Sequence, residues 1–183
     1  MTSQTLTSVT NRLIGEGLIS KWHREEFRDQ HRQLYLTPRV AKELECYWDK
    51  LFNDTPGRWE ARGRSLYFLL RRWLEGGRMH YEDQIKSLTP WDDGIWEFKA
   101  AFPKPAVRLL GFIPDVDVFV AVGFYRRGFL GDGRQSRWDA ATSQALGEWD
   151  RLYDGAVPLC CPESMRDAVG LRSFWSDKND KEA

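Results

Sequence analysis

Apolar residues recur every three to four positions through much of the first half of the chain, which is the spacing of amphipathic helices. The strongest pattern predicts a helix over residues 38–52, with one apolar face made of Val40, Leu44, Tyr47, Trp48, Leu51 and Phe52. A second helix is predicted from Trp59 to Glu75, where Gly76 and Gly77 end it. Residues 33–36 precede both helices and are predicted to form a short strand.

The period of the pattern changes to two after residue 94, which indicates strands. Three short strands are predicted over residues 95–101, 107–113 and 117–124. Tight turns join them, so they are expected to form an antiparallel meander. A final helix is predicted after a glycine-containing loop. Its buried face is expected to consist of Trp138, Ala141, Ala145, Leu146, Trp149, Leu152 and Tyr153.

These elements predict an α+β fold. A small antiparallel sheet, made of the N-terminal strand and the C-terminal three-strand meander, is expected to be packed by two N-terminal helices and one C-terminal helix. The length of 183 residues fits one domain with extensions. We predict a helical N-terminal extension over residues 1–32, a main domain over residues 33–157, and a C-terminal tail over residues 158–183 whose end is disordered.

The overall charge gives no support for nucleic-acid binding, because 27 basic residues are balanced by 27 acidic ones. Arginine is nevertheless clustered locally, since residues 58–78 hold six arginines and two acids. This segment is either a solvated helix face or a stripe that binds phosphate.

The cysteines and histidines predict no metal centre and no disulfide framework. Cys46, Cys160 and Cys161 form no C-x-x-C motif, and the three histidines lack metal-ligand spacing. An odd number of cysteines favours reduced thiols. No apolar run is long enough to span a membrane, and no secretory signal is visible. We therefore expect a cytoplasmic protein that makes no contact with a membrane.

Three segments around the predicted meander carry a recognisable order of residues. They are Gly94-Ile95-Trp96-Glu97-Phe98-Lys99, then Arg108-Leu109-Leu110-Gly111-Phe112, then Val120-Ala121-Val122-Gly123-Phe124-Tyr125-Arg126-Arg127. Over residues 33–155 this pattern resembles the RelE/HigB family of bacterial toxins, particularly its phage-derived branch. The resemblance implies a small antiparallel sheet packed by helices. It also implies cleavage of mRNA, usually on the ribosome, without a metal or other cofactor, and a partner antitoxin that blocks toxicity.

In that family the 2′-hydroxyl of the RNA is the attacking group, so the protein must position the RNA backbone and stabilise charge on the phosphate. The resemblance assigns this catalytic role to Arg126, Arg127, Arg108 and Lys99. Further RNA contacts are expected from Arg134, Arg137, Arg62, Arg71 and Arg72. Glu97 is expected to be a cross-strand partner of Lys99 or Arg108.

Other features favour an alternative function. The chain has an N-terminal arm, a C-terminal tail and zero net charge, and its meander and last helix contain no histidine to act as a general base. The alternative is a catalytically inactive RelE-fold protein of a phage or prophage that binds a protein or a nucleic acid. Exposed Trp22, Trp59 and Trp175 would then make a protein contact. A third and less favoured hypothesis is DNA binding by the N-terminal helices, in which acids nearly balance the bases.

Overall fold

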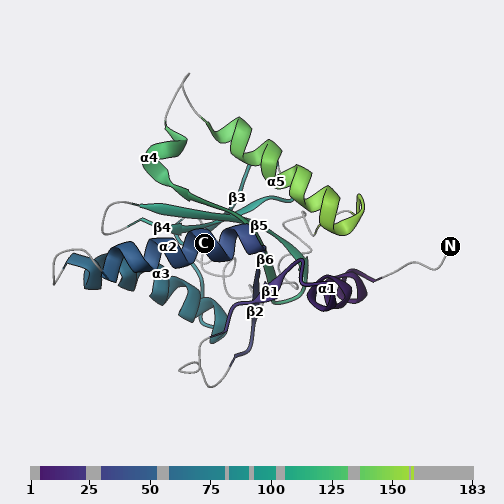
Figure 1. Cartoon of the computed structure of the whole chain (residues 1–183), viewed down its shortest axis with the longest axis horizontal. Coiled ribbons are helices and arrows are strands. Elements are labelled where there is room, and N and C mark those ends of the chain that lie inside the picture. Colours follow the sequence, from purple (N-terminus) through teal and green to yellow (C-terminus); the bar gives the residue numbers. More distant parts are fainter. Residues whose placement is uncertain are drawn as a thin grey trace, which may run out of the picture.

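The computed structural model describes residues 5–23, 30–52, 58–80, 83–90, 93–101, 106–131, 137–156 and 158, and these form an α+β fold as predicted (Figure 1). The strands are β1 (Ser20–Lys21), β2 (Gln33–Leu36), β3 (Ile85–Ser87), β4 (Trp96–Ala100), β5 (Val107–Asp115) and β6 (Val118–Arg126). The helices are α1 (Leu6–Gly15), α2 (Pro38–Phe52), α3 (Arg58–Leu74), α4 (Arg127–Leu130) and α5 (Trp138–Tyr153).

The strands form one six-stranded sheet in the order β1-β2-β6-β5-β4-β3. The predicted meander is confirmed, because β4, β5 and β6 pair antiparallel in sequence. The prediction of an antiparallel sheet throughout is wrong at one position, where β2 pairs parallel with β6. Alternation of apolar residues selects the face that a side chain occupies, and it carries no signal for the direction of the neighbouring strand. The sheet is therefore mixed.

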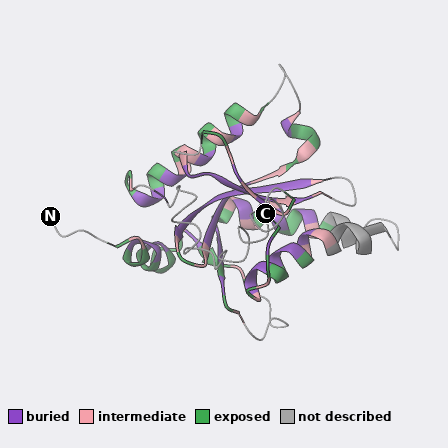
Figure 2. Ribbon diagram, turned by 180° about the vertical axis from the view of Figure 1, so that it is seen from behind, coloured by how far each residue is buried: buried purple, intermediate pink, exposed green. Residues whose placement is uncertain are grey.

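Helices cover both faces of this sheet. Figure 1 shows α5 above the sheet and α2 and α3 below it. Residues Leu34 and Leu36 of β2 pack with α2 and α3, whereas Tyr35 between them packs with α1 and α5. In Figure 2 the strands are mostly buried and the outer sides of the helices are exposed. The two faces are called below the α2/α3 face and the α1/α5 face.

The N-terminal extension contributes to both the helices and the sheet. Helix α1 is present as expected, and Val9 and Leu13 pack into the core on the α1/α5 face. The extension was predicted to be helical over residues 1–32, but Ser20–Lys21 forms strand β1 and pairs with β2. Gly17 adopts a positive φ of 70°, which ends the helix and turns the chain back to the sheet edge.

Two short elements were not predicted. Strand β3 pairs with β4 at the far edge of the sheet, and its three residues are too few to show alternation. Helix α4 begins directly after β6, where the glycines at 128 and 131 predicted a flexible loop. It brings Leu130 into the core beside Leu110 and Ala141. The burial of Leu130 therefore outweighs the low helix propensity of Gly128.

Candidate nucleic-acid interface

Five charged side chains gather on the α1/α5 face, where β3, β4, β5 and α4 meet: Lys86, Glu97, Lys99, Arg108 and Arg127. In the sheet register Lys86 lies opposite Glu97, and Lys99 lies opposite Arg108. All four cations act electrostatically on the single carboxylate. The cluster therefore holds three more positive charges than negative ones, although the whole chain is neutral.

Glu97 and Arg108 form a buried ion pair at the centre of this cluster. Arg108 Nε lies 3.0 Å from Glu97 Oε2, and the two side chains are 10% and 7% exposed. The close approach is electrostatic, because those two atoms do not make an aligned hydrogen bond. Burial raises the pKa of Glu97 although the surrounding cations lower it, and burial also lowers the pKa of Arg108. The prediction that Glu97 partners Arg108 is confirmed.

Arg127 is the first residue of α4 and is fixed on the same face. Its Nη1 donates a hydrogen bond of 2.7 Å to the carbonyl oxygen of Gly131. Its guanidinium carbon lies 5.7 Å from the centre of the Trp138 ring, within reach of a cation–π interaction. The backbone N–H of Arg127 also donates to the carbonyl oxygen of Ala106, so the position is also held by the residue that precedes β5.

An exposed aromatic ring lies beside these cations. Phe129 is 53% exposed. Its ring stacks on Tyr125, with ring centres 6.4 Å apart and an interplanar angle of 11°. The guanidinium of Arg137 lies 4.3 Å from the centre of the Phe129 ring. The sequence predicted Arg137 but not Phe129. Phe129 could have been found because it is an apolar residue in the basic segment that follows β6.

We call Lys99, Arg127, Phe129 and Arg137 the cationic–aromatic surface. Lys99 and Arg127 are half-buried, whereas Phe129 and Arg137 are exposed. Guanidinium and ammonium groups bind phosphate oxygens, and an exposed ring provides a face on which an unpaired base can stack. This combination is suited to single-stranded nucleic acid, in which bases are free to stack on protein side chains.

Arg126 does not belong to this surface. It is exposed and lines a cavity with α2, so it lies on the α2/α3 face. Along β6 its neighbour Tyr125 points the other way, and the Tyr125 hydroxyl donates to Gln144 of α5. A single RNA groove would need Arg108, Arg126 and Arg127 on one face. The structure places Arg126 on the opposite face from the other two.

The arginine-rich segment also lies elsewhere. Arg71 and Arg72 are exposed on α3, in the helix layer that covers the opposite face, and Arg71 Nε lies 2.8 Å from Glu75. Arg134 and the side chain of Arg62 lie outside the described residues. The predicted RNA-binding set is therefore divided between two faces, with Arg137 alone of its described members on the cationic–aromatic surface.

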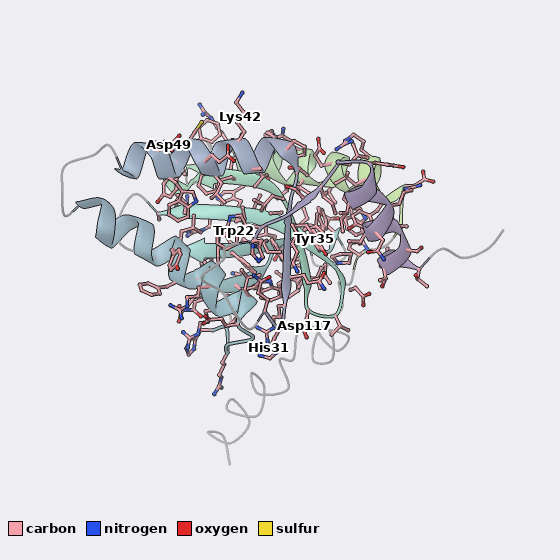
Figure 3. The ribbon with its side chains drawn as sticks, turned by 60° about the horizontal axis from the view of Figure 1, so that its bottom comes forward. Trp22, His31, Tyr35, Lys42, Asp49 and Asp117 are labelled. Carbon is pink, nitrogen blue, oxygen red and sulfur yellow. The ribbon has the colours of Figure 1, made fainter. Side chains whose placement is uncertain are left out.

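The tryptophans proposed for a protein contact are not supported as a group. Trp22 is half-buried and packs against the core of the α2/α3 face (Figure 3). The side chain of Trp59 and the whole of Trp175 lie outside the described residues. Trp22 is thus partly a core residue rather than a freely exposed ring.

None of the helices described is long and apolar enough to cross a membrane. In the same part of the chain no three His, Cys, Asp or Glu side chains are grouped as metal ligands. Comparison of the chain with models of protein families, with curated proteins and with solved structures gave no match in any of the three.

Proposed function

We propose that this protein is a RelE/HigB-like toxin, a metal-independent endoribonuclease that cleaves mRNA on the ribosome and binds the RNA across the cationic–aromatic surface. The observation that carries the proposal is the gathering of cations beside an exposed ring, on one face of a neutral protein. The order of elements on which the resemblance rests also supports it, because β2 is followed by α2, α3, the meander and α5.

Each group has a distinct role in this proposal. Lys99 and Arg127 bind oxygens of the phosphate that is attacked, and their charge stabilises the phosphorane. Arg108 is too deeply buried to reach RNA directly, so its part is to offset the negative charge of Glu97 beneath the surface. Phe129 and Arg137 stack on a neighbouring base and set the register of the strand.

Solvent water carries the protons in this proposal: it accepts the proton of the 2′-hydroxyl as the 2′-O–P bond forms, and it protonates the 5′-oxygen that leaves as the P–O5′ bond breaks. The 2′-hydroxyl must lose a proton as it attacks, and an arginine is too basic to accept it. Glu97 has a raised pKa, but its carboxylate is buried and paired with Arg108. Holding the attacking oxygen in line with the leaving oxygen therefore provides the rate enhancement, together with charge stabilisation.

A second candidate is a catalytically inactive RelE-fold protein that binds RNA or a protein partner. The observation that favours it is the division of the four predicted catalytic cations. Arg108 is buried in an ion pair, and Arg126 lies on the opposite face. Such a protein would keep the binding surface without cutting the RNA. For the active toxin, an antitoxin partner would act by covering the cationic–aromatic surface.

The two candidates are separated by inducing expression in bacteria and mapping new 5′ ends in cellular mRNA. Three proteins are compared: wild type, the double variant Lys99→Ala/Arg127→Ala, and the control Arg12→Ala/Lys21→Ala. The control removes one arginine and one lysine that are exposed in α1 and β1. Endoribonuclease activity predicts growth arrest and discrete cleavages in wild type and control, both lost in the double variant. Intact mRNA with all three proteins would reject the nuclease and leave the inactive binding protein.

A further inference from the structure

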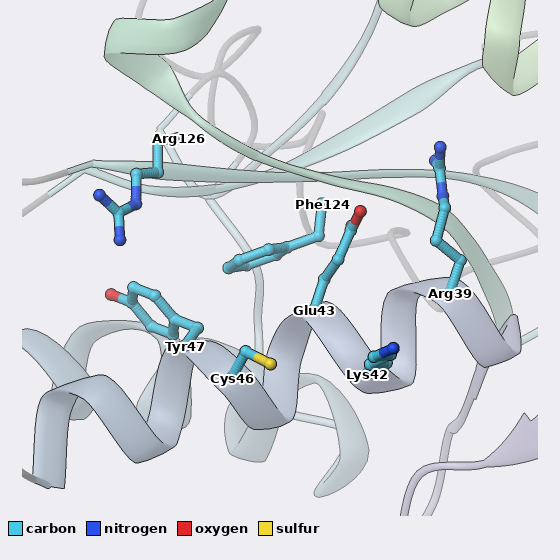
Figure 4. Close-up of a pocket in the computed structure, with 7 residues that line it drawn as sticks. All are labelled: Arg39, Lys42, Glu43, Cys46, Tyr47, Phe124 and Arg126. Carbon is cyan, nitrogen blue, oxygen red and sulfur yellow. The ribbon is translucent and has the colours of Figure 1, made fainter.

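A second site lies on the α2/α3 face, in a cavity of about 450 Å³ between α2 and β6. This volume is within the range of small-molecule sites in proteins. The cavity is lined by Arg39, Lys42, Glu43, Cys46, Tyr47, Phe124 and Arg126 (Figure 4). It is on the opposite side of the sheet from the cationic–aromatic surface, so a ligand bound here would not compete directly with RNA bound there.

Two aromatic rings form the apolar part of the cavity. Tyr47 of α2 and Phe124 of β6 meet edge to face, with ring centres 5.3 Å apart. Tyr47 is buried in the core of this face, so the pair has a fixed position. Phe124 is only half-buried and lies between Tyr47 and Glu43 in Figure 4. The open part of this ring provides a surface for a planar ligand group.

The charges around these rings are mainly positive. Arg126 and Lys42 are both exposed, and Lys42 extends outward from α2 (Figure 3). Among the described side chains neither forms an ion pair. Arg39 lies at the same end of the cavity as Lys42 (Figure 4), where its Nη2 donates a hydrogen bond of 2.8 Å to the carbonyl oxygen of Val122. Glu43 is the one acid in the lining, so three cations face a single carboxylate.

We propose that this cavity binds a nucleotide, with the base against Phe124 and the phosphate on Arg126, while Lys42 adds positive charge from the opposite end of the cavity (Figure 4). The guanidinium of Arg126 can bind two phosphate oxygens at once. An inorganic anion would leave the apolar ring uncovered, and an uncharged planar molecule would leave both cations unpaired. A nucleotide satisfies both features because it joins a flat ring system to a phosphate at short range.

The nucleotide has two sources, a free mononucleotide or one residue of an RNA strand. Both offer the same base and phosphate to the cavity. The proposal does not rest on the endoribonuclease activity, because its residues belong to other elements and to the other face of the sheet.

Cys46 provides a readout at the site itself. It is a free, exposed cysteine that lines the cavity. Alkylation of Cys46 is followed by peptide mapping of the full-length protein, with AMP, adenosine, inorganic phosphate or a short oligoribonucleotide present. We expect saturable protection by AMP and much weaker protection by adenosine or phosphate. Protection by the oligoribonucleotide alone would also support the proposal and would identify RNA as the source.

Variants test which groups hold the ligand. Arg126→Ala changes an exposed side chain and is expected to weaken protection about tenfold, because a charge-assisted hydrogen bond to phosphate is lost. Lys42→Ala, at the opposite end of the cavity, should weaken protection less, because it removes only a distant charge. Phe124→Leu keeps an apolar side chain and should weaken binding of AMP but not of inorganic phosphate. Arg12→Ala is the matched control on α1 and should bind as wild type.

Three results would overturn the proposal. They are the absence of protection by both AMP and the oligoribonucleotide, equal protection by inorganic phosphate and AMP, and unchanged protection in Arg126→Ala. Far-ultraviolet circular dichroism of each variant shows whether a loss of protection comes from unfolding. If a variant is unfolded, Arg126→Lys, which keeps the charge but loses the two-pronged contact, replaces it and is expected to bind more weakly than wild type.

Discussion

Arg126 and Arg127 are neighbours in the chain, yet their side chains serve opposite faces of the sheet. Arg126 lines the cavity beside α2, whereas Arg127 lies 5.7 Å from the Trp138 ring at the start of α5. Alternation puts neighbouring residues on opposite faces, and it continues from Arg126, the last residue of β6, to Arg127, the first residue of α4. A pair of arginines that resembles one functional unit in the sequence is therefore two separate groups.

This separation predicts that Arg127 contributes to RNA binding through phosphate contacts. Arg127→Ala is expected to weaken binding of single-stranded RNA about tenfold at low salt, because one charge-assisted contact is removed. The slope of log affinity against log salt concentration should fall by about 0.7, the value for one phosphate contact on a single strand. Fluorescence anisotropy with labelled RNA over a salt series measures both quantities.

Arg12→Ala is the control for that measurement, since Arg12 is exposed on α1 and pairs only weakly with Glu16 at 4.0 Å. It should keep the affinity and the slope of the wild-type protein. If Arg127→Ala gave the same slope as Arg12→Ala, Arg127 would not contact phosphate, and the cationic–aromatic surface would need another boundary.

The sequence predicted those elements in which apolar residues recur over many positions and the pattern arises within the element itself. Helix α2 follows from apolar residues at helical spacing, and Val40, Leu44 and Tyr47 are buried as that spacing requires. The parallel pairing of β2 with β6 joins segments about 85 residues apart, as in the register of Gln33 with Val118. No local pattern encodes such a pairing, because the intervening helices and meander determine where the chain returns.

The candidate site was predicted in part. Glu97 was expected to be a cross-strand partner of Lys99 or Arg108, and it forms an ion pair with Arg108. The burial of that pair was not expected, because it depends on α4 and α5 covering this end of the sheet. Phe129 was missed for the same reason, since its value to the site comes from Tyr125 and Arg137, which contact it in space.

The buried ion pair predicts strongly non-additive effects on stability. Glu97→Leu alone leaves the guanidinium of Arg108 buried without its counter-charge and should lower the free energy of unfolding by about 3 kcal/mol or more. Arg108→Met alone should have a similar cost at neutral pH. The double variant Glu97→Leu/Arg108→Met should lose far less than the sum, because no charge is left buried.

Chemical denaturation of the four proteins in this cycle gives the coupling energy. The pH dependence adds an independent check on Arg108→Met. Burial already raises the pKa of Glu97, and loss of Arg108 raises it further. A raised pKa in the folded state means that stability is greater at low pH and is lost as pH rises through that pKa. Purely additive costs in the cycle would argue against the buried pair.

Tyr153 predicts a limit to stability in alkaline solution. Burial raises its pKa to about 12 from the usual 10.0. The Tyr153 hydroxyl and Thr10 Oγ1 form a buried hydrogen bond of 2.9 Å. The folded protein keeps the hydroxyl proton of Tyr153 after an unfolded chain would lose it. The free energy of unfolding should therefore fall between about pH 10 and pH 12, by about 1.4 kcal/mol per pH unit for this one group.

The variant Tyr153→Phe removes the titrating hydroxyl and should flatten that part of the stability curve. Ultraviolet absorbance of tyrosinate, recorded alongside denaturation at each pH, identifies the residue that titrates late. A curve for Tyr153→Phe as steep as the wild-type curve would show that other groups cause the alkaline loss.

Gly111 predicts a severe packing defect on substitution. A Cβ atom at this position would lie 2.2 Å from the carbonyl oxygen of Val120 and 2.7 Å from the ring of Phe119. These are backbone and core atoms of β6 that have little freedom to move. Gly111→Ala is expected to lower the free energy of unfolding by about 3 kcal/mol. The matched change Gly147→Ala, where no atom lies within 4 Å of the added carbon, should be neutral or stabilising.

Photocrosslinking of thiouridine-substituted single-stranded RNA to the purified protein, followed by peptide mapping, tests the central claim most directly. The cationic–aromatic surface predicts crosslinks in the peptides that contain Phe129 and Trp138, and their strong reduction in Lys99→Ala/Arg127→Ala but not in Arg12→Ala/Lys21→Ala. Crosslinks confined to other peptides, or equal crosslinking of these two variants at Phe129 and Trp138, would contradict an RNA site on this face of the sheet.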